Sequence, residues 1–228
     1  MIADYFMSLD PLALLRAMPG TAAQGIIWGI MALGVYITFR ILDFADLTVD
    51  GSLATGAAVA VMLIQGGMST ALALVFSVLA GMAAGVVTGI FHTLLGIPGI
   101  LASILTQVSL YSVNLGIMGK SNQGISLTQQ GLVASSRYVT GGDSAFFFLK
   151  LILFCLILVG IVYWFFGTAA GAAIRATGCN TQMARAQGIN TNYTKVLALM
   201  ISNGLVGLCG GVLAQYQGAA DVNMGLGA

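Results

Sequence analysis

Six long apolar stretches follow one another along the chain, and they constrain the fold more than any other feature of the sequence. A helix that crosses a bilayer needs about 20 predominantly apolar residues. The sequence therefore predicts an all-α, polytopic transmembrane bundle that forms one domain over residues 1–228. The six candidate spans are Ala22–Phe39, Gly51–Gln65, Ser69–Phe91, Leu94–Met118, Ala145–Phe166 and Val196–Gln217.

The composition excludes the soluble classes of protein. Only 7% of the residues are charged and 58% are hydrophobic, whereas a soluble domain carries roughly 25% charged residues. The net charge is +1, and no basic run marks a nucleic-acid contact, so no nucleic-acid partner is expected. The medium that suits this composition is the lipid bilayer.

No catalytic constellation is visible in the sequence. The only histidine, His92, ends the third span, and neither a GxSxG nor an HExxH motif occurs. The three cysteines lack CxxC spacing, so a zinc site is not expected. Gly119-Lys120-Ser121 resembles the end of a phosphate loop, but Asn114 occupies the place of the first glycine. The sequence thus predicts no catalytic residue, metal or cofactor, and no means of hydrolysing ATP.

The first 19 residues differ from the spans that follow. Asp4, Asp10 and Arg16 alternate with apolar side chains, and Pro19-Gly20 closes the stretch. This pattern predicts a short interfacial helix over residues 1–19. Within the third span, glycines recur every four residues, which predicts a face for close helix packing; they are Gly81, Gly85 and Gly89.

A polar segment interrupts the first two spans. Ionisable groups at membrane depth are costly and usually face a cavity or one another, and broken helices line solute pathways. The segment is therefore a candidate solute pathway, although a solvated turn between helices is the alternative. Within the spans, Gln107 and Asn203 are weaker candidates, because such side chains more often bond neighbouring helices. The candidate pathway residues are Arg40, Asp43, Asp46, Asp50 and Asn114.

The connector from Gly167 to Lys195 contains signals for a short helix. We expect Gly178 to stop the preceding helix as a left-handed cap and Asn180 to cap the next one, which covers Thr181–Gln187 and ends at Gly188. These signals predict a short helix across the mouth of the bundle. A plain amphipathic surface helix is the alternative.

The same connector resembles a known family. Arg175-Ala176-Thr177-Gly178 and the segment from Met183 to Asn190, MARAQGIN, match the cytoplasmic loop of ABC importer permease subunits of the branched-chain amino acid class. Asp43-Phe44-Ala45-Asp46, with Gly51 after it, occupies the place of a second family segment, with aspartates at two positions where the family has Asn and His.

This resemblance implies a coupling helix that binds a separate ABC ATPase subunit. It places the 167–195 connector in the cytoplasm and the 119–144 connector outside, where a solute-binding protein delivers an amino acid or related solute. Counting Lys and Arg cannot orient the bundle, because four fall on each side. The implied ATPase-coupling residues are Arg175, Thr177, Gly178, Asn180, Met183, Ala184, Arg185, Gly188 and Ile189.

The resemblance also implies a bacterial inner-membrane location and a second permease copy or paralogue. Family members continue for several spans beyond the equivalent of Ala228, so we expect further C-terminal spans to be missing from this chain. Two alternatives stay open: an ion-coupled secondary transporter or channel that needs no ATPase, and a purely structural membrane subunit. The transporter or channel gives no reason for the short helix between Gly178 and Gly188, and the structural subunit accounts for the glycine face but leaves the polar break unused.

Overall fold

A computed structural model describes residues 11–125, 134 and 144–226 of the chain. Within this part the protein is essentially all-α, and six of its helices are long and apolar enough to cross a membrane. The predicted transmembrane bundle is confirmed. Its elements are α2 (Pro11–Tyr36), the π-helix η1 (Ile37–Ile41), α3 (Thr48–Gln65), α4 (Thr70–Thr93), α5 (Gly99–Met118), β1 (Asn122–Gly124), α7 (Ser144–Gly167), α8 (Ala169–Cys179), α9 (Thr181–Ala186), α10 (Thr191–Gln217) and β2 (Ala219–Asp221).

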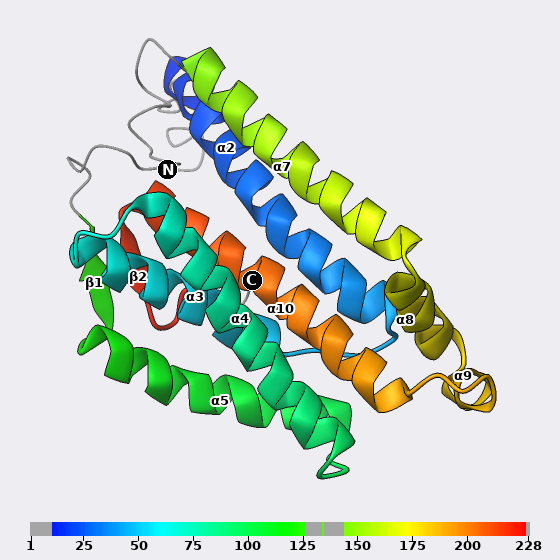
Figure 1. Cartoon of the computed structure of the whole chain (residues 1–228). Helices are drawn as coiled ribbons and strands as arrows, with labels where there is room; N and C mark the ends of the chain where they lie inside the picture. The colour runs from blue at the N-terminus through cyan, green and yellow to red at the C-terminus, as the bar shows by residue number, and fades with distance from the viewer. Residues whose placement is uncertain (1–10, 126–133, 135–143, 227–228) are drawn as a thin grey trace, which may run out of the picture.

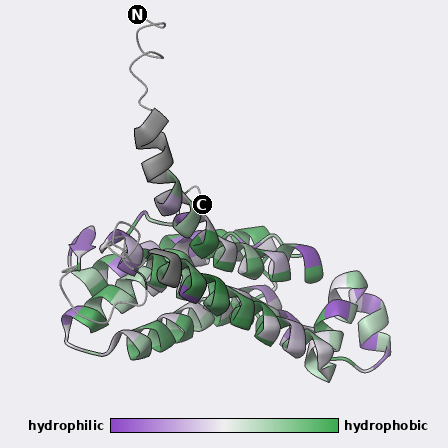
Figure 2. Cartoon of the chain, turned by 90° about the horizontal axis from the view of Figure 1, so that it is seen from above, coloured by the Kyte–Doolittle hydropathy of each residue, from purple (hydrophilic) through white to green (hydrophobic). Residues whose placement is uncertain are grey.

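Helix α10 lies at the centre of the bundle and packs against α4, α3 and α2 (Figure 1). Helix α5 packs on α3 and α4, while α7 lies along α2 on the other side. Helices α8 and α9 form a small pair at one end, and β1 and β2 lie at the opposite end. Figure 2 shows hydrophobic residues along the long helices and hydrophilic residues gathered in the helical pair and at the helix ends.

The predicted glycine face of the third span is confirmed as a packing surface. A Cβ atom at Gly81 would collide with the carbonyl oxygen of Asn203, and one at Gly85 with the carbonyl oxygen of Leu199. At Gly89 it would lie 2.9 Å from Cγ2 of Val196. Backbone-to-backbone approach of this kind is what small residues permit in membrane helices, so α4 and α10 are fixed against each other along their length.

The predicted separate helix over residues 1–19 is corrected by the structure. From Pro11 onward one helix continues to Tyr36, with Pro19 inside it, so the Pro19-Gly20 pair does not end a helix. Proline within a spanning helix is tolerated because neighbouring groups re-satisfy the backbone that it frees. Residues 1–10 lie outside the described residues.

Helix α10 begins five residues before the predicted span, at Thr191. The Asn190 side chain caps it by accepting hydrogen bonds of 3.2 Å from the backbone N–H groups of Asn192 and Tyr193. Lys195 therefore belongs to the helix and not to the connector, which the sequence had extended to residue 195. Charge on one side chain does not prevent a capped helix from starting before the apolar run.

The predicted outer connector over residues 119–144 begins with β1, which the sequence did not reveal. This strand pairs antiparallel with β2, with Asn122 opposite Asp221 and Gly124 opposite Ala219. The ribbon ties the end of α5 to the end of α10. Between β1 and α7, only Ile125 and Ala134 belong to the described residues.

Candidate functional site

The first two spans are separated by a true break in the helical backbone. Helix α2 ends in the π-turn η1, in which the Leu42 N–H donates to the Ile37 carbonyl at 3.0 Å. The chain is then non-helical until α3 begins at Thr48. Asp43 has φ of 55°, a conformation that Asp adopts more readily than most residues. The chain therefore changes direction sharply at Asp43 and enters the bundle.

Asp46 is the polar centre of this break. Its carboxylate accepts a 2.7 Å hydrogen bond from the Asn203 amide on α10 and a 2.9 Å hydrogen bond from the Thr48 backbone N–H. The Asn203 amide oxygen accepts in turn from the Ser52 hydroxyl at 2.7 Å. Asp46 thus accepts from a backbone N–H at the start of α3 that has no carbonyl partner within the helix, and it lies at the positive end of that helix. One chain of hydrogen bonds joins the break, α3 and α10.

These contacts show that the break lies deep within the bundle. Asn203 is the thirteenth of the 27 residues of α10, about 18 Å from the start of the helix at 1.5 Å per residue. Between the two spanning segments, burial raises the pKa of the Asp46 carboxyl group, and the hydrogen bonds from Thr48 and Asn203 oppose this rise. The chain therefore holds an ionisable group near the middle of its central helix.

A second polar contact lies beside the first. The hydroxyl groups of Thr48 and Thr88 are 2.7 Å apart and join α3 to α4, and both side chains are buried. The sequence analysis missed Thr48, Ser52 and Thr88. A signal was present, because Thr48, Ser52 and Thr55 follow helical spacing on one face of an otherwise apolar segment.

The structure does not bring the four charged residues of the break together. The side chains of Arg40 and Asp43 are exposed, whereas Asp46 turns toward α10. Asp50 lies in the first turn of α3 and accepts a long 3.5 Å contact from the Gln107 amide on α5. The predicted cluster is therefore corrected: Asp46 and Asp50 belong to two different polar sites, because the start of α3 carries them toward different helices.

Asp50 and Asn114, two of the predicted pathway residues, do share a site. Both line a cavity of about 300 Å³, together with Gln107 and Tyr111. The cavity lies between the first turn of α3 and the face of α5, and Val222 and Leu226 of the segment after β2 also line it. The weaker candidates Gln107 and Asn203 thus each contact one of the aspartates.

The predicted short helix is present as α9, with Asn180 as its N-cap. The Asn180 side chain accepts from the backbone N–H groups of Gln182 and Met183, both at 3.0 Å. Gly188 has φ of 80°, a left-handed conformation that favours glycine, and it ends the turn as predicted. The helix spans Thr181–Ala186, one residue fewer than expected.

Gly178 behaves differently from the prediction. It lies inside α8, which continues to Cys179, and it is not a left-handed cap. Its lack of a side chain serves close packing instead, because a Cβ atom there would collide with the carbonyl oxygen of Ile41. Helix α8 therefore rests directly on η1, the turn that leads into the break.

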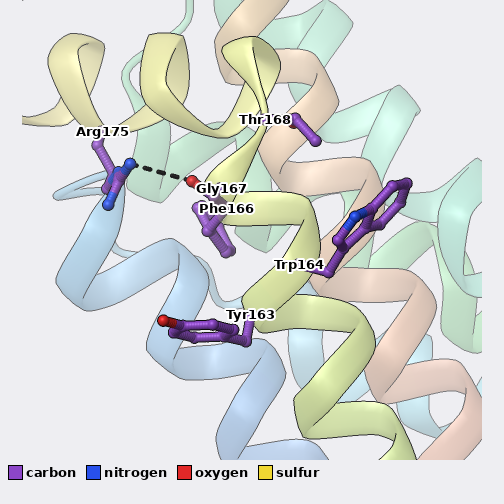
Figure 3. A pocket seen from close by; sticks show the side chains of 6 residues that line it. All are labelled: Tyr163, Trp164, Phe166, Gly167, Thr168 and Arg175. Carbon is purple, nitrogen blue, oxygen red and sulfur yellow. Dashed lines mark hydrogen bonds between the residues drawn. The ribbon is translucent and has the colours of Figure 1, made fainter.

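Two further contacts hold α8 in place. The Arg175 guanidinium donates a 3.0 Å hydrogen bond to the Phe166 carbonyl at the end of α7 (Figure 3), and the hydroxyl of Thr177 lies 2.9 Å from that of Thr194 on α10. Next to Arg175, the exposed rings of Tyr163 and Trp164 line a hollow at the α7–α8 junction. Aromatic side chains of this kind mark membrane boundaries.

The remaining predicted coupling residues divide into an inner and an outer set. Ala184 is buried, and Ile189 is half-buried. Arg185 has an exposed side chain whose Nε donates to the Thr191 hydroxyl at 2.8 Å, which ties α9 to the start of α10. Met183 is 64% exposed and projects from the short helix. The outer surface of α9 is thus centred on Met183 and supported by fixed contacts behind it.

Comparisons with known proteins agree with this architecture. The family model for the permease component of branched-chain amino acid transport systems matches residues 18–228. A tyrosine transport system permease protein of Clostridioides difficile (strain R20291) is 41% identical over 206 residues, which cover 90% of this chain and 66% of that protein. The uncharacterized protein RP368 of Rickettsia prowazekii (strain Madrid E) is 36% identical, covering 90% and 70%.

More distant relatives include the autoinducer 2 import system permease protein LsrC of Escherichia coli O9:H4 (strain HS). It is 32% identical over 172 residues, which cover 73% of this chain and 47% of that protein. No solved structure matches the chain significantly. Because the family model covers nearly the whole sequence, the chain belongs to the family of permease components of branched-chain amino acid transport systems, and it is a multi-pass protein of the bacterial cell membrane.

Proposed function

We propose that the protein is a membrane-spanning permease subunit of an ABC importer. It forms the translocation path for a small solute, an amino acid or related compound, and a separate ABC ATPase subunit hydrolyses ATP. The observation that carries this proposal is the mounting of α9, a short helix that Asn180 caps and Gly188 ends. Arg185 holds it to α10, and Arg175 holds the preceding helix α8 to the end of α7. A rigidly mounted, exposed helix suits docking to a partner chain.

The contact between Gly178 and Ile41 gives a mechanism for coupling. A displacement of α9 by the ATPase moves α8, and α8 rests on η1 at Ile41. Because η1 leads into the break, the movement reaches Asp46 and its hydrogen bond to Asn203. Two alternative packings of α8 on η1 would then correspond to inward and outward access, as in other two-state interfaces.

The solute path in this proposal follows the polar break and the cavity beside it. Asp46 and Asp50 supply charge within an otherwise apolar bundle, where an unpaired charge costs at least about 2.5 kcal/mol. Charged groups within a bundle therefore usually contact a solute or water in a cavity, or bond a neighbouring helix. If α8 and α9 face the cytoplasm, the exposed Arg40 and Asp43 lie at the cytoplasmic entrance to the break.

The orientation places α8 and α9 in the cytoplasm and the β1–β2 ribbon outside. The external side then receives solute from a solute-binding protein, and a second permease copy or paralogue completes the path. Relatives named as a tyrosine permease and an autoinducer 2 import permease support a small organic solute. The chain spans 66% of the first of these relatives and 47% of the second.

An ion-coupled secondary transporter or channel is the second candidate. Its support is the break itself, because broken helices also hold coupling ions. It requires no partner at α9, so the two candidates differ in whether an ATPase binds the protein.

The experiment is detergent extraction of tagged protein from its native host, followed by identification of co-purifying ATPase. Met183→Glu places a charge on the outer surface of α9 and should reduce the co-purified ATPase at least fivefold. Ser121→Glu adds the same charge at an exposed position on the opposite end and should leave the ATPase bound. Equal ATPase recovery with both variants, or no ATPase with the wild type, contradicts the proposal.

A further inference from the structure

The cavity between α3 and α5 has the features of a built binding site. Its volume of about 300 Å³ lies at the lower end of the range for small-molecule sites, roughly 300–1,000 Å³. Gly51 allows the close approach of the two helices, because a Cβ atom there would lie 3.2 Å from the Gln107 Cα atom. Close backbone packing therefore sets the distance between α3 and α5 at this cavity.

Asn114 is the most informative residue in the wall of this cavity. Its side chain is 1% exposed, and among the residues that the structure describes neither its amide nitrogen nor its amide oxygen has a hydrogen-bond partner. Buried amides are nearly always hydrogen-bonded. An unpaired amide beside a cavity indicates a partner that enters the cavity.

The charge of the cavity selects the class of that partner. Among the described residues that line it, Asp50 is the only charged one. The Gln107 amide approaches the Asp50 carboxylate only at 3.5 Å, at the limit of a hydrogen bond, so the carboxylate keeps its capacity to accept stronger donors. Tyr111 adds an aromatic wall, and aromatic faces attract organic cations.

The position of the cavity relates it to the break. Asp50 lies in the first turn of α3, four residues after Asp46 in the break. The cavity extends along α5 from Gln107, near the middle of that helix, to Asn114, closer to its β1 end. A solute that enters from the β1 end would therefore meet this cavity before it reaches the Asp46–Asn203 contact.

Resting on the proposed function, we propose that the α3–α5 cavity is a solute subsite specific for a protonated primary amine. The Asp50 carboxylate pairs with the ammonium group, Tyr111 covers it, and the Asn114 amide bonds a second polar group of the solute. An α-amino acid carries both groups in a compact frame. A metal ion suits the cavity poorly, because among the described residues no group of three or more His, Cys, Asp or Glu side chains comes together.

The test measures ligand-induced thermal stabilisation of the purified permease in the complex in which it is extracted. The probes are an equimolar pool of proteinogenic L-amino acids, the same pool N-acetylated, and sodium chloride against potassium chloride. We expect the free amino acids to stabilise the wild type and the acetylated pool to have at most one tenth of the potency, since acetylation removes the ammonium charge.

Two variants locate the effect. Asp50→Asn should raise the half-saturating concentration about tenfold or more, because a charge-assisted contact becomes a neutral one. Asp221→Asn removes one carboxylate from the β1–β2 ribbon, outside the cavity, and should bind as the wild type does. The subsite is overturned if no pool stabilises the protein, if both pools stabilise it equally, if Asp50→Asn binds normally, or if sodium alone gives the full shift.

This outcome is separable from that of the proposed function. Loss of the amine effect with normal ATPase recovery rejects the subsite and leaves the importer intact. A normal amine effect without a bound ATPase rejects the importer and leaves an amine-binding secondary transporter.

Discussion

The Asn203 amide at the middle of α10 donates a 2.7 Å hydrogen bond to the Asp46 carboxylate in the break between η1 and α3. The same amide group accepts from Ser52 and donates to the Leu199 carbonyl at 3.1 Å. One side chain thereby uses both ends of its amide to hold a non-helical segment within the bundle. Asn203 is fully buried, so the segment depends on a contact that water cannot replace.

Asn203→Leu should destabilise the protein by about 1–3 kcal/mol, because it leaves the Asp46 carboxylate and the Ser52 hydroxyl with fewer partners in a buried place. The measurement is thermal or denaturant unfolding in detergent. Asn192→Leu makes the same change at an exposed position of the same helix and should have an effect within about 0.5 kcal/mol. Equal losses in the two variants contradict the role of Asn203.

Gly85→Ala should destabilise the α4–α10 contact, because the new methyl group collides with the Leu199 carbonyl. Overpacking at such a site costs about 1–3 kcal/mol. Gly160→Ala in α7 has no atom within 4 Å of the new Cβ, and the better helix propensity of alanine should make it neutral or stabilising. Unfolding of both variants under one condition checks the pair, and a stable Gly85→Ala would rule out tight packing.

The six spans could be predicted from the sequence because apolar runs of sufficient length are read from composition alone. The capping of α9 was also predictable, because Asn180 and Gly188 affect only the backbone within a few residues of their own positions. The role of Gly178 was not predictable, because the Ile41 carbonyl that it accommodates lies far away in sequence. A glycine near a helix end can be a left-handed cap or a position of close packing, and only the neighbouring element in the structure shows which it is.

The candidate site shows the same difference between local signals and contacts that are distant in sequence. Aspartates in an apolar region were recognisable as unusual, but their partners on α5 and α10 depend on how the helices cross. The sequence grouped Arg40, Asp43, Asp46 and Asp50 because they are neighbours in the chain. The turn at Asp43 and the start of α3 separate them in space, and no local pattern specifies the direction in which α3 enters the bundle.

The native Cys179 offers a test of orientation. It is exposed at the end of α8, whereas Cys209 is buried. In intact cells an impermeant thiol reagent should fail to label Cys179, and in inverted vesicles it should label it. Cys179→Ser identifies the labelled residue. Conversely, Ser121→Cys in a cysteine-free background should react from outside, and the reverse pattern would reject the cytoplasmic placement of α8 and α9.

Gly188→Val tests the shape of α9. With φ of 80° at this position, a β-branched residue is strained, at a cost of about 1–3 kcal/mol, and the turn after α9 should relax to another conformation. The protein should still insert in the membrane, but the amount of co-purified ATPase should fall severalfold. Undiminished ATPase binding would show that the turn does not shape the docking surface.

The last prediction separates docking from transmission. Gly178→Ala leaves the outer surface of α9 unchanged, so ATPase should co-purify at the wild-type level. The new methyl group collides with the Ile41 carbonyl and forces α8 away from η1, so ATP-driven uptake of amino acids in proteoliposomes should fall at least tenfold. Gly167→Ala, at the end of α7, places a methyl group where no atom lies within 4 Å and should transport normally. Docking and uptake lost together in Gly178→Ala would indicate a collapsed α8–α9 pair, and unchanged uptake would show that η1 does not transmit the movement. Only retained docking with lost uptake supports the path from α9 through Gly178 and Ile41 to Asp46.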